Sequence, residues 1–329
     1  MIISRTPLRI SLAGGGSDLP EYYKKNHFGR VISIGINKYI YVIIKKQINI
    51  YDYKFKIRWS RFEQCDSLND IKHPIIREVL KFFKINEPLE ICTFSDVPIS
   101  SGLGSSSTFC VGLINAILAF KNIQQTKGYV ADLAANLEIN VLNRKIGKQD
   151  HYAASYGGIN EITFFDNDTV EVNPVFYKKK IIEELINNLL LVYTNKQRSA
   201  SKVIKKINFK TQSKNIKKMI DQVTSYRKIF EGKKSLDEVG VLLNKGWIMK
   251  KSLSKKNISN NKLDKIYNIS KKKGALGGKI CGAGGGGFML LYAKKKNHLR
   301  IKNSLKHLPF YDFDFDLSGS RITYYDERV

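Results

Sequence analysis

The stretch Ser101–Ser107, SGLGSSS, places two glycines and three consecutive serines directly before an apolar segment with helical spacing. Gly102 and Gly104 permit positive φ and let a ligand approach the backbone closely. The serines would occupy the first helical turn, where backbone N–H groups lack partners within the helix. With the positive end of the helix dipole, these donors form a site suited to phosphate. A serine-capped helix after a tight turn is the plainer alternative, and the missing lysine excludes a Walker loop.

Two further glycine-rich segments lie on either side of this loop along the chain. Residues 13–18, AGGGSD, end a strand-like segment that carries Arg9. Gly282–Phe288, GAGGGGF, satisfies the GxGxxG dinucleotide pattern in form, but that pattern requires a following helix. The strand-like FMLLY follows instead, so this segment indicates a backbone that another group approaches closely.

The elements that must position these loops alternate in type over the first half of the chain. Helical spacing marks residues 74–83, with proline in the first turn, and residues 127–142. Lysine-rich helices are expected from about residue 181 to 270, and a strand, a helix and a strand close the chain. The change from mixed elements to lysine-rich helices therefore predicts an N-terminal domain over 1–180 and a C-terminal domain over 181–329. β-branched and aromatic residues predict strands at 31–46, 48–59, 89–96 and 157–165.

The bulk composition is that of a globular protein, with 329 residues, 43% hydrophobic and 26% charged. No segment approaches the roughly 20 apolar residues that span a bilayer. Arg5 and Arg9 interrupt the first apolar run, which argues against a signal peptide. Four scattered cysteines without metal-site spacing predict reduced thiols. We therefore expect a cytoplasmic protein with no membrane partner.

The net charge of +27 raises nucleic acid as a partner. The excess is diffuse: residues 178–306 hold 33 Lys and Arg against 7 Asp and Glu, mostly as scattered pairs and triplets. No zinc-finger spacing, RNP-like motif or recognition helix accompanies it. We interpret the charge as a basic surface that gathers anionic small molecules. A nucleic-acid-binding protein is kept as the alternative from another functional class.

The order of the three glycine-rich motifs resembles that of the galactokinase, homoserine kinase, mevalonate kinase and phosphomevalonate kinase (GHMP) superfamily. Within it, RTPLRISLAGGGSDLPEYY, GLGSSSTF, GKQDHYAASYGGIN and GALGGKICGAGGGGF look like the sugar-phosphorylating branch. They are most similar to the D-glycero-D-manno-heptose 7-phosphate kinases, with L-fucose kinase domains close by. The resemblance implies a two-domain α+β fold, with a ribosomal protein S5 domain 2-like N-terminal part and a ferredoxin-like C-terminal α/β sandwich. The active site would lie in the cleft between them.

The resemblance also implies ATP as a substrate and Mg²⁺ as its companion ion. Mg²⁺ prefers hard oxygen ligands and keeps several waters, so few protein ligands are needed. By resemblance these are the Ser106 hydroxyl and the Glu138 carboxylate, although Glu138 taken alone would pass for a surface glutamate. The residues expected to bind ATP are Ser101, Gly102, Leu103, Gly104, Ser105, Ser106 and Ser107.

Asp150, in GKQDHYAASYGG, matches the catalytic aspartate of the superfamily. It would orient the acceptor hydroxyl and take its proton as the new bond forms. Arg9 matches the cation beside that aspartate and would offset charge building on the transferred group. A strand arginine paired with another carboxylate is the alternative for Arg9. His151 receives no role, because a histidine next in sequence more often packs or faces solvent.

The expected acceptor site combines residues from the first and third glycine-rich motifs with Arg198 from the second half. Asp18 matches the position that holds sugar hydroxyls in galactokinases, and small glycines beside it leave room for a longer carbon chain. Arg198, near a helix start that also carries Ser201, is suited to a phosphate already on the acceptor. The expected acceptor-binding residues are Ser17, Asp18, Arg198, Gly284 and Gly285.

These interpretations lead to an ATP- and Mg²⁺-dependent kinase acting on the anomeric C1 hydroxyl of D-glycero-D-manno-heptose 7-phosphate. Its product would be the 1,7-bisphosphate, on the route to nucleotide-activated heptose for capsule or lipopolysaccharide. A related anomeric sugar kinase, such as an L-fucose kinase, is the nearest alternative. Asp18 and the GKQDHYAASYGG block argue against isoprenoid or homoserine acceptors. The oligomeric state stays open, with a homodimer as one option.

Overall fold

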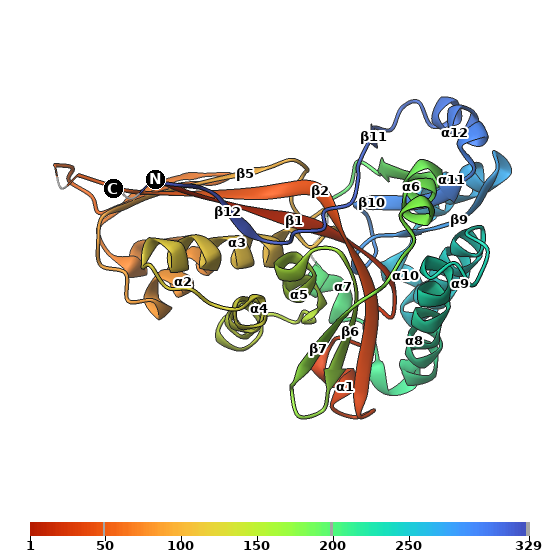
Figure 1. Cartoon of the computed structure of the whole chain (residues 1–329), viewed down its shortest axis with the longest axis horizontal. Helices are drawn as coiled ribbons and strands as arrows, with labels where there is room; N and C mark the ends of the chain where they lie inside the picture. The colour runs from red at the N-terminus through yellow and green to blue at the C-terminus, as the bar shows by residue number, and fades with distance from the viewer. Residues whose placement is uncertain (49, 198–199, 327–329) are drawn as a thin grey trace.

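A computed structural model describes residues 1–48, 50–197 and 200–326 of the chain. Within these residues the strands form one sheet of eight strands and one of four, and helices pack against both (Figure 1). The expected mixed α+β fold is confirmed. No helix in this described part is long and apolar enough to cross a membrane.

The eight-stranded sheet is organised by two long neighbouring strands, β1 (Ile2–Ala13) and β2 (Phe28–Lys46). β-branched residues dominate β2, whose first part pairs with β6 and whose second part pairs with β5. Of the strand expected at 48–59, only β3 (Phe55–Arg58) forms, because residues 50–52 are exposed and bury no side chain against the sheet. The remaining strands are β4 (Phe62–Cys65), β5 (Leu89–Ser95), β6 (Ile159–Phe165), β7 (Val170–Pro174) and β12 (Arg321–Tyr325).

Four helices cover one face of this sheet, and α3 lies at their centre. α3 (Ser105–Phe120) is buried on almost every side, because it packs against β1 and β2 and also contacts the other three helices. An all-round apolar helix of this kind is a core element. Its N-terminus is therefore held at a fixed place. The other helices are α2 (Pro74–Phe82), α4 (Lys127–Asn136) and α5 (Gln149–Tyr156).

The second half of the chain builds an antiparallel sheet in the order β11–β8–β10–β9. α9 packs against β9 and β10, and α8 packs against α9, so this sheet has a core of its own. Its strands are β8 (Leu189–Tyr193), β9 (Ala275–Ile280), β10 (Phe288–Ala293) and β11 (Phe310–Tyr311). The helices around both sheets are α1 (Pro20–Tyr23), α6 (Lys179–Asn188), α7 (Ala200–Ile204), α8 (Phe209–Phe230), α9 (Glu238–Leu253), α10 (Lys255–Ile258), α11 (Asn261–Lys272) and α12 (His298–Ser304).

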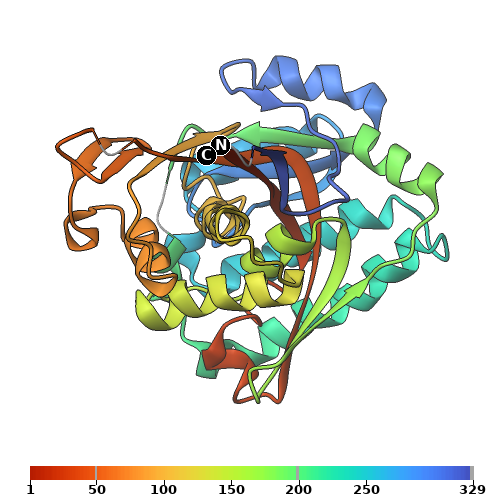
Figure 2. The same ribbon diagram turned by 60° about the vertical axis from the view of Figure 1, so that its left-hand side comes forward.

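The last strand returns to the first sheet. β12 pairs antiparallel with β1, and Figures 1 and 2 both show this dark-blue strand beside the red one. The larger hydrophobic cluster likewise runs from β1 and β2 into α8, α9 and β10. The two halves therefore share a core, and the segment 321–325 lies with the first half in space. The division at residue 180 stays a prediction.

Candidate active site

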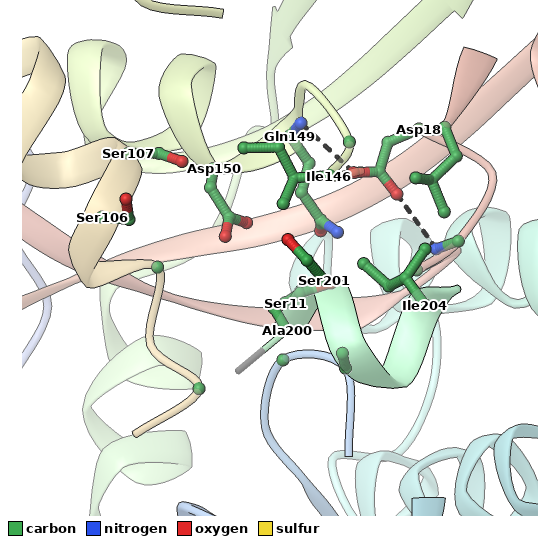
Figure 3. Close-up of a pocket in the computed structure, with 18 of the residues that line it drawn as sticks. Ser11, Asp18, Ser106, Ser107, Ile146, Gln149, Asp150, Ala200, Ser201 and Ile204 are labelled. Carbon is green, nitrogen blue, oxygen red and sulfur yellow. Dashed lines mark hydrogen bonds between the residues drawn. The ribbon is translucent and has the colours of Figure 1, made fainter. Parts of the chain in front are cut away.

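A cavity of about 480 Å³ is lined by residues from both halves of the chain. The end of β1, the glycine turn after it and the starts of α3 and α5 supply mainly polar groups (Figure 3). The second half supplies an apolar wall and two lysines, Lys250 and Lys279. The apolar wall consists of Ile204, Ile207, Met219, Leu253 and Ile258.

The start of α3 faces this cavity. Gly104, the residue before the helix, has φ +83°, and its carbonyl accepts the first intrahelical bond from the Thr108 N–H. The positive φ favours glycine at this position, and a Cβ there would lie 3.3 Å from Asp150 Oδ2, a tight contact. Ser105, Ser106 and Ser107 follow and line the cavity. The first-turn N–H groups, which have no partner within the helix, therefore begin at the cavity wall.

Arg9 and Asp150 form the central ion pair of the cavity. Arg9 Nε and Nη2 each donate to one carboxylate oxygen of Asp150 at 2.7 Å. The third guanidinium nitrogen, Nη1, donates to the Gly102 carbonyl at 2.8 Å. Arg9 is buried, so this bidentate geometry fixes both the carboxylate and the glycine loop. The structure thus brings the two expected catalytic residues together at the mouth of α3.

Glu138 is fully buried and is the centre of a second polar cluster. Its Oε1 accepts from the Ser106 hydroxyl at 2.6 Å and from Arg144 Nη1 at 2.5 Å. Its Oε2 accepts from His151 Nε2 at 2.9 Å, and His151 is buried as well. Burial alone would raise the pKa of Glu138, but His151, Arg144 and Ser106 outweigh it and lower this pKa to about 2.

A short π-helical segment positions Glu138. Residues Leu137–Val141 continue α4 with the wider π-helical turn instead of the α-helical one. Such turns insert a residue and re-aim side chains, and they occur frequently at functional sites. Here the carboxylate is directed at Ser106 on α3. The two residues expected to hold a magnesium ion are therefore in direct contact.

Asp18 lies on the opposite side of the cavity from Ser106 (Figure 3). Its carboxylate accepts backbone N–H bonds from Gly16 at 3.0 Å and from Gln149 at 3.4 Å. Gly147 packs so tightly on Asp18 that a Cβ there would overlap the carboxylate. Burial, and next the charge of Asp150, raise the pKa of Asp18 to about 6. A buried carboxylate facing a cavity is a good acceptor for ligand hydroxyls.

Several residues expected at the site lie behind its wall. Leu103 is buried, and its carbonyl accepts from the Arg9 N–H at 3.2 Å. Ser101 is buried too, and its carbonyl accepts from the Phe288 N–H at 2.9 Å. The Ser17 hydroxyl bonds with the backbone of Arg30. These three residues support the cavity from outside, and their contact with a ligand stays a prediction.

In the third glycine-rich segment, the residues that line the cavity precede the two glycines that were expected to bind the acceptor. Gly282 and Ala283 line it. Gly284 packs against Ile258, and the Gly285 N–H donates to the Ile258 carbonyl at 2.8 Å. The role of Gly284 and Gly285 toward the acceptor therefore stays a prediction. Arg198 lies outside the described residues, whereas Ser201 lines the cavity.

Sequence reasoning missed several polar residues of the cavity region, among them His151, Arg144 and Lys279. His151 and Arg144 complete the Glu138 cluster, and Lys279 is a buried lysine at the cavity wall. The adjacency of His151 to Asp150 was a visible signal, but sequence alone could not pair it with a glutamate 13 positions earlier. For Lys279 the only signal was its place just before the third glycine-rich segment.

Comparison with known proteins identifies the family that this chain resembles. Residues 72–158 match GHMP kinases N terminal domains, and residues 230–307 match GHMP kinases C terminal. The D-glycero-alpha-D-manno-heptose 7-phosphate kinase of Campylobacter jejuni is 33% identical over 335 residues, which cover 97% of each chain. The bifunctional fucokinase/GDP-fucose pyrophosphorylase of Arabidopsis thaliana is 28% identical over 88% of this chain and 29% of its own length.

A solved structure shares the fold over the whole chain. The D-glycero-D-manno-heptose 1-phosphate kinase from Bacteriodes thetaiotaomicron superposes with a TM-score of 0.81 at 23% identity and covers 99% of this chain and 100% of its own. The Arg9–Asp150 pair, the mouth of α3 and the Ser106–Glu138 contact lie within this shared fold. The chain therefore belongs to the GHMP kinases and is an ATP-dependent kinase of that family.

Proposed function

We propose that this kinase transfers the γ-phosphoryl group of ATP to the anomeric C1 hydroxyl of D-glycero-D-manno-heptose 7-phosphate. The product is the 1,7-bisphosphate, an intermediate toward nucleotide-activated heptose for capsule or lipopolysaccharide. The observation that carries the proposal is the bidentate Arg9–Asp150 pair, placed between the mouth of α3 and the buried Asp18. The similarity to the Campylobacter jejuni enzyme supports the choice of acceptor.

Phosphoryl transfer depends mainly on positioning and on neutralising charge. The free N–H groups at the start of α3 bind the phosphates of ATP. Asp150, fixed by Arg9 at 2.7 Å, accepts the proton of the acceptor hydroxyl as the oxygen–phosphorus bond forms. The bond between the γ-phosphorus and its bridging oxygen breaks, and ADP leaves. Arg9 faces the same space and offsets charge on the transferred group.

The Ser106 hydroxyl and the Glu138 carboxylate fit a magnesium ion, because both are hard oxygen ligands. The cluster already accommodates positive charge: Arg144 Nη1 lies 2.8 Å from Ser106 Oγ and 2.5 Å from Glu138 Oε1. Bound there with ATP, Mg²⁺ would neutralise phosphate charge. The lowered pKa of Glu138 keeps the carboxylate ionised at neutral pH.

Asp18 supplies selection for a polyhydroxylated acceptor. Its carboxylate is almost completely buried and accepts only two backbone N–H bonds, so an acceptor that lacks the matching hydroxyl leaves part of its hydrogen-bonding capacity unused. Sites of this kind discriminate strongly, since an incompletely hydrogen-bonded buried carboxylate is costly. The apolar wall of the cavity, which includes Ile204 and Ile258, can pack against the carbon-bound faces of a sugar chain.

The test is a panel of acceptors assayed for ADP release, with phosphorus NMR to locate the new phosphate. The panel contains heptose 7-phosphate, free heptose, D-mannose, L-fucose, D-galactose and mevalonate. We expect the highest kcat/KM with heptose 7-phosphate and a phosphate on C1. Asp150→Asn should lower kcat by about 10²–10⁴-fold while ATP still binds.

Preference for L-fucose would replace the proposed acceptor and keep the anomeric chemistry. Turnover of none of the sugars would refute the proposal. Salt-dependent binding to duplex DNA, measured in parallel, tests the alternative drawn from the net charge. Tight, sequence-specific DNA binding without sugar turnover would favour that alternative.

A further inference from the structure

Lys279 is a buried lysine that the mechanism above does not use. It lies on β9 in the second half of the chain, is only 5% exposed and lines the cavity. Its Nζ donates to the carbonyls of Ser11 and Leu12, at 2.9 and 3.1 Å. Among the described residues no carboxylate forms an ion pair with it, and the titratable groups that act on it are Cys281 and Arg9.

A buried ammonium without an anionic partner is costly for a folded protein. Two carbonyls take two of its three N–H donors, which leaves one donor unassigned. The nearby Arg9 cannot compensate Lys279, and its own charge is already matched by Asp150. Among the described residues, no carboxylate therefore pairs with Lys279 in this part of the cavity.

A second, independent observation concerns Ser11. Its hydroxyl is buried, lines the same cavity and has no hydrogen-bond partner among the described residues. Ser11 follows Arg9 by two positions on β1, so both side chains point to the same face of the strand. Figure 3 labels Ser11 just below Ser201. An orphan hydroxyl that lines the same cavity as an ammonium without a paired carboxylate indicates a missing ligand rather than a packing role.

We propose that Lys279 and Ser11 form an anion subsite that binds a phosphate oxygen during the reaction. The inference rests on the proposed kinase chemistry for its two sources of phosphate, which are the group in transfer and a phosphate already on the acceptor. Lys279 gives its remaining N–H and Ser11 gives its O–H. The second half of the chain thereby supplies a charged group, besides its apolar wall, to the cavity.

The subsite is tested directly with sulfate as a tetrahedral anion, because sulfate keeps its charge near neutral and mildly alkaline pH. Binding is measured calorimetrically with saturating ADP present. Lys279→Met and Ser11→Ala should each weaken sulfate about 10- to 100-fold, the range for a hydrogen bond to a charged group. Lys245→Met, an exposed lysine on α9, is the matched control and should leave the affinity unchanged. Unchanged sulfate affinity in both Lys279→Met and Ser11→Ala would overturn the inference.

A pH series separates charge from mere packing. Burial lowers the pKa of Lys279 to about 8. Sulfate affinity should therefore fall as the pH rises through about 8 in the native chain, and this fall should vanish in Lys279→Met. The charged and titratable groups around Lys279 are Arg9 on β1, Cys281 next to it and Lys250 on α9. Burial raises the pKa of the Cys281 thiol, so the thiol stays neutral in the pH range where Lys279 loses its proton. An identical pH dependence in both proteins would count against the subsite.

Kinetics then assign the source of the phosphate. An equal loss of kcat on free and phosphorylated sugars in Lys279→Met assigns the subsite to the group in transfer. A rise in KM confined to phosphorylated sugars assigns it to the phosphate of the acceptor. If no sugar is turned over but sulfate still binds more weakly to the variants, the proposed function is refuted and the anion subsite is supported. If heptose 7-phosphate is turned over and the variants bind sulfate normally, the subsite falls and the proposed function stands.

Discussion

The buried Glu138 cluster gives a prediction whose size follows from the structure. Replacing His151 by Phe removes the N–H that reaches Glu138 Oε2 at 2.9 Å and leaves that oxygen buried without a partner. In the native chain the pKa of Glu138 moves from 4.5 to about 2, which corresponds to about 3 kcal/mol at about 1.4 kcal/mol per tenfold change. A lost hydrogen bond to a charged group is typically worth about 1.5–3 kcal/mol. We therefore expect His151→Phe to lower the free energy of unfolding by about 2–3 kcal/mol at pH 7.

The sign of the pH dependence follows from linkage. A carboxylate with a lowered pKa in the folded state stabilises the fold above its unfolded pKa, here 4.5. That stabilisation is lost as the pH falls toward about 2. The difference between the native chain and His151→Phe should thus be full at pH 7 and should narrow below about 4.5.

Urea denaturation measured at a series of pH values is the assay. His151→Gln, which keeps an N–H donor, is the matched control and should recover part of the loss. Because His151 orients an expected ligand of Mg²⁺, His151→Phe should also raise the Mg²⁺ concentration needed for activity about 10- to 100-fold. A variant whose unfolding free energy and Mg²⁺ requirement both equal those of the native chain would refute this account of the cluster.

Three further predictions concern other residues of the cavity. Arg9→Met should lower kcat by about 10²–10³-fold and leave ATP binding measurable, because it removes the charge beside the transferred group; an unchanged kcat in single-turnover assays would contradict this. Asp18→Asn should stabilise the fold at pH 8, because an acid whose pKa is raised to about 6 penalises the fold above that pH, and the gain should vanish below about 4 in denaturation experiments. The same variant should raise the KM of the acceptor and not that of ATP. Gly104→Ala should lower both the free energy of unfolding and kcat, since alanine is strained at φ +83° and its Cβ would press on Asp150. An alanine variant with the native kcat and the native free energy of unfolding would show that this contact is unimportant.

Much of the local structure could be predicted from the sequence. The proline at the start of α2, the spacing of α4 and the β-branched run of β2 each specify their element through neighbouring residues. The strand expected at residues 48–59 formed only in part, because the burial that it needed is not a local property. β-Branched and aromatic residues favour a strand only where they pack against a sheet, and residues 50–52 remain exposed.

The contacts that make the site belong to the tertiary structure. Arg9 and Asp150 are 141 positions apart, and Lys279 reaches Ser11 across 268. No local pattern encodes which side chains such distant segments bring together. The return of β12 to β1 was invisible for the same reason, because a strand's own residues do not say which sheet it joins.

The sequence by itself determined the chemical parts: three glycine-rich loops, the serines that begin a helix and the aspartates at positions 18 and 150. Backbone freedom and helix-start geometry are local properties, so residue types alone specify them. Only the tertiary structure decided the electrostatics, because a charge acquires its role from burial and from its partners. Contacts with His151 and Arg144 lower the pKa of Glu138. The position of Lys279 on β9 places its charge beside backbone carbonyls rather than a carboxylate.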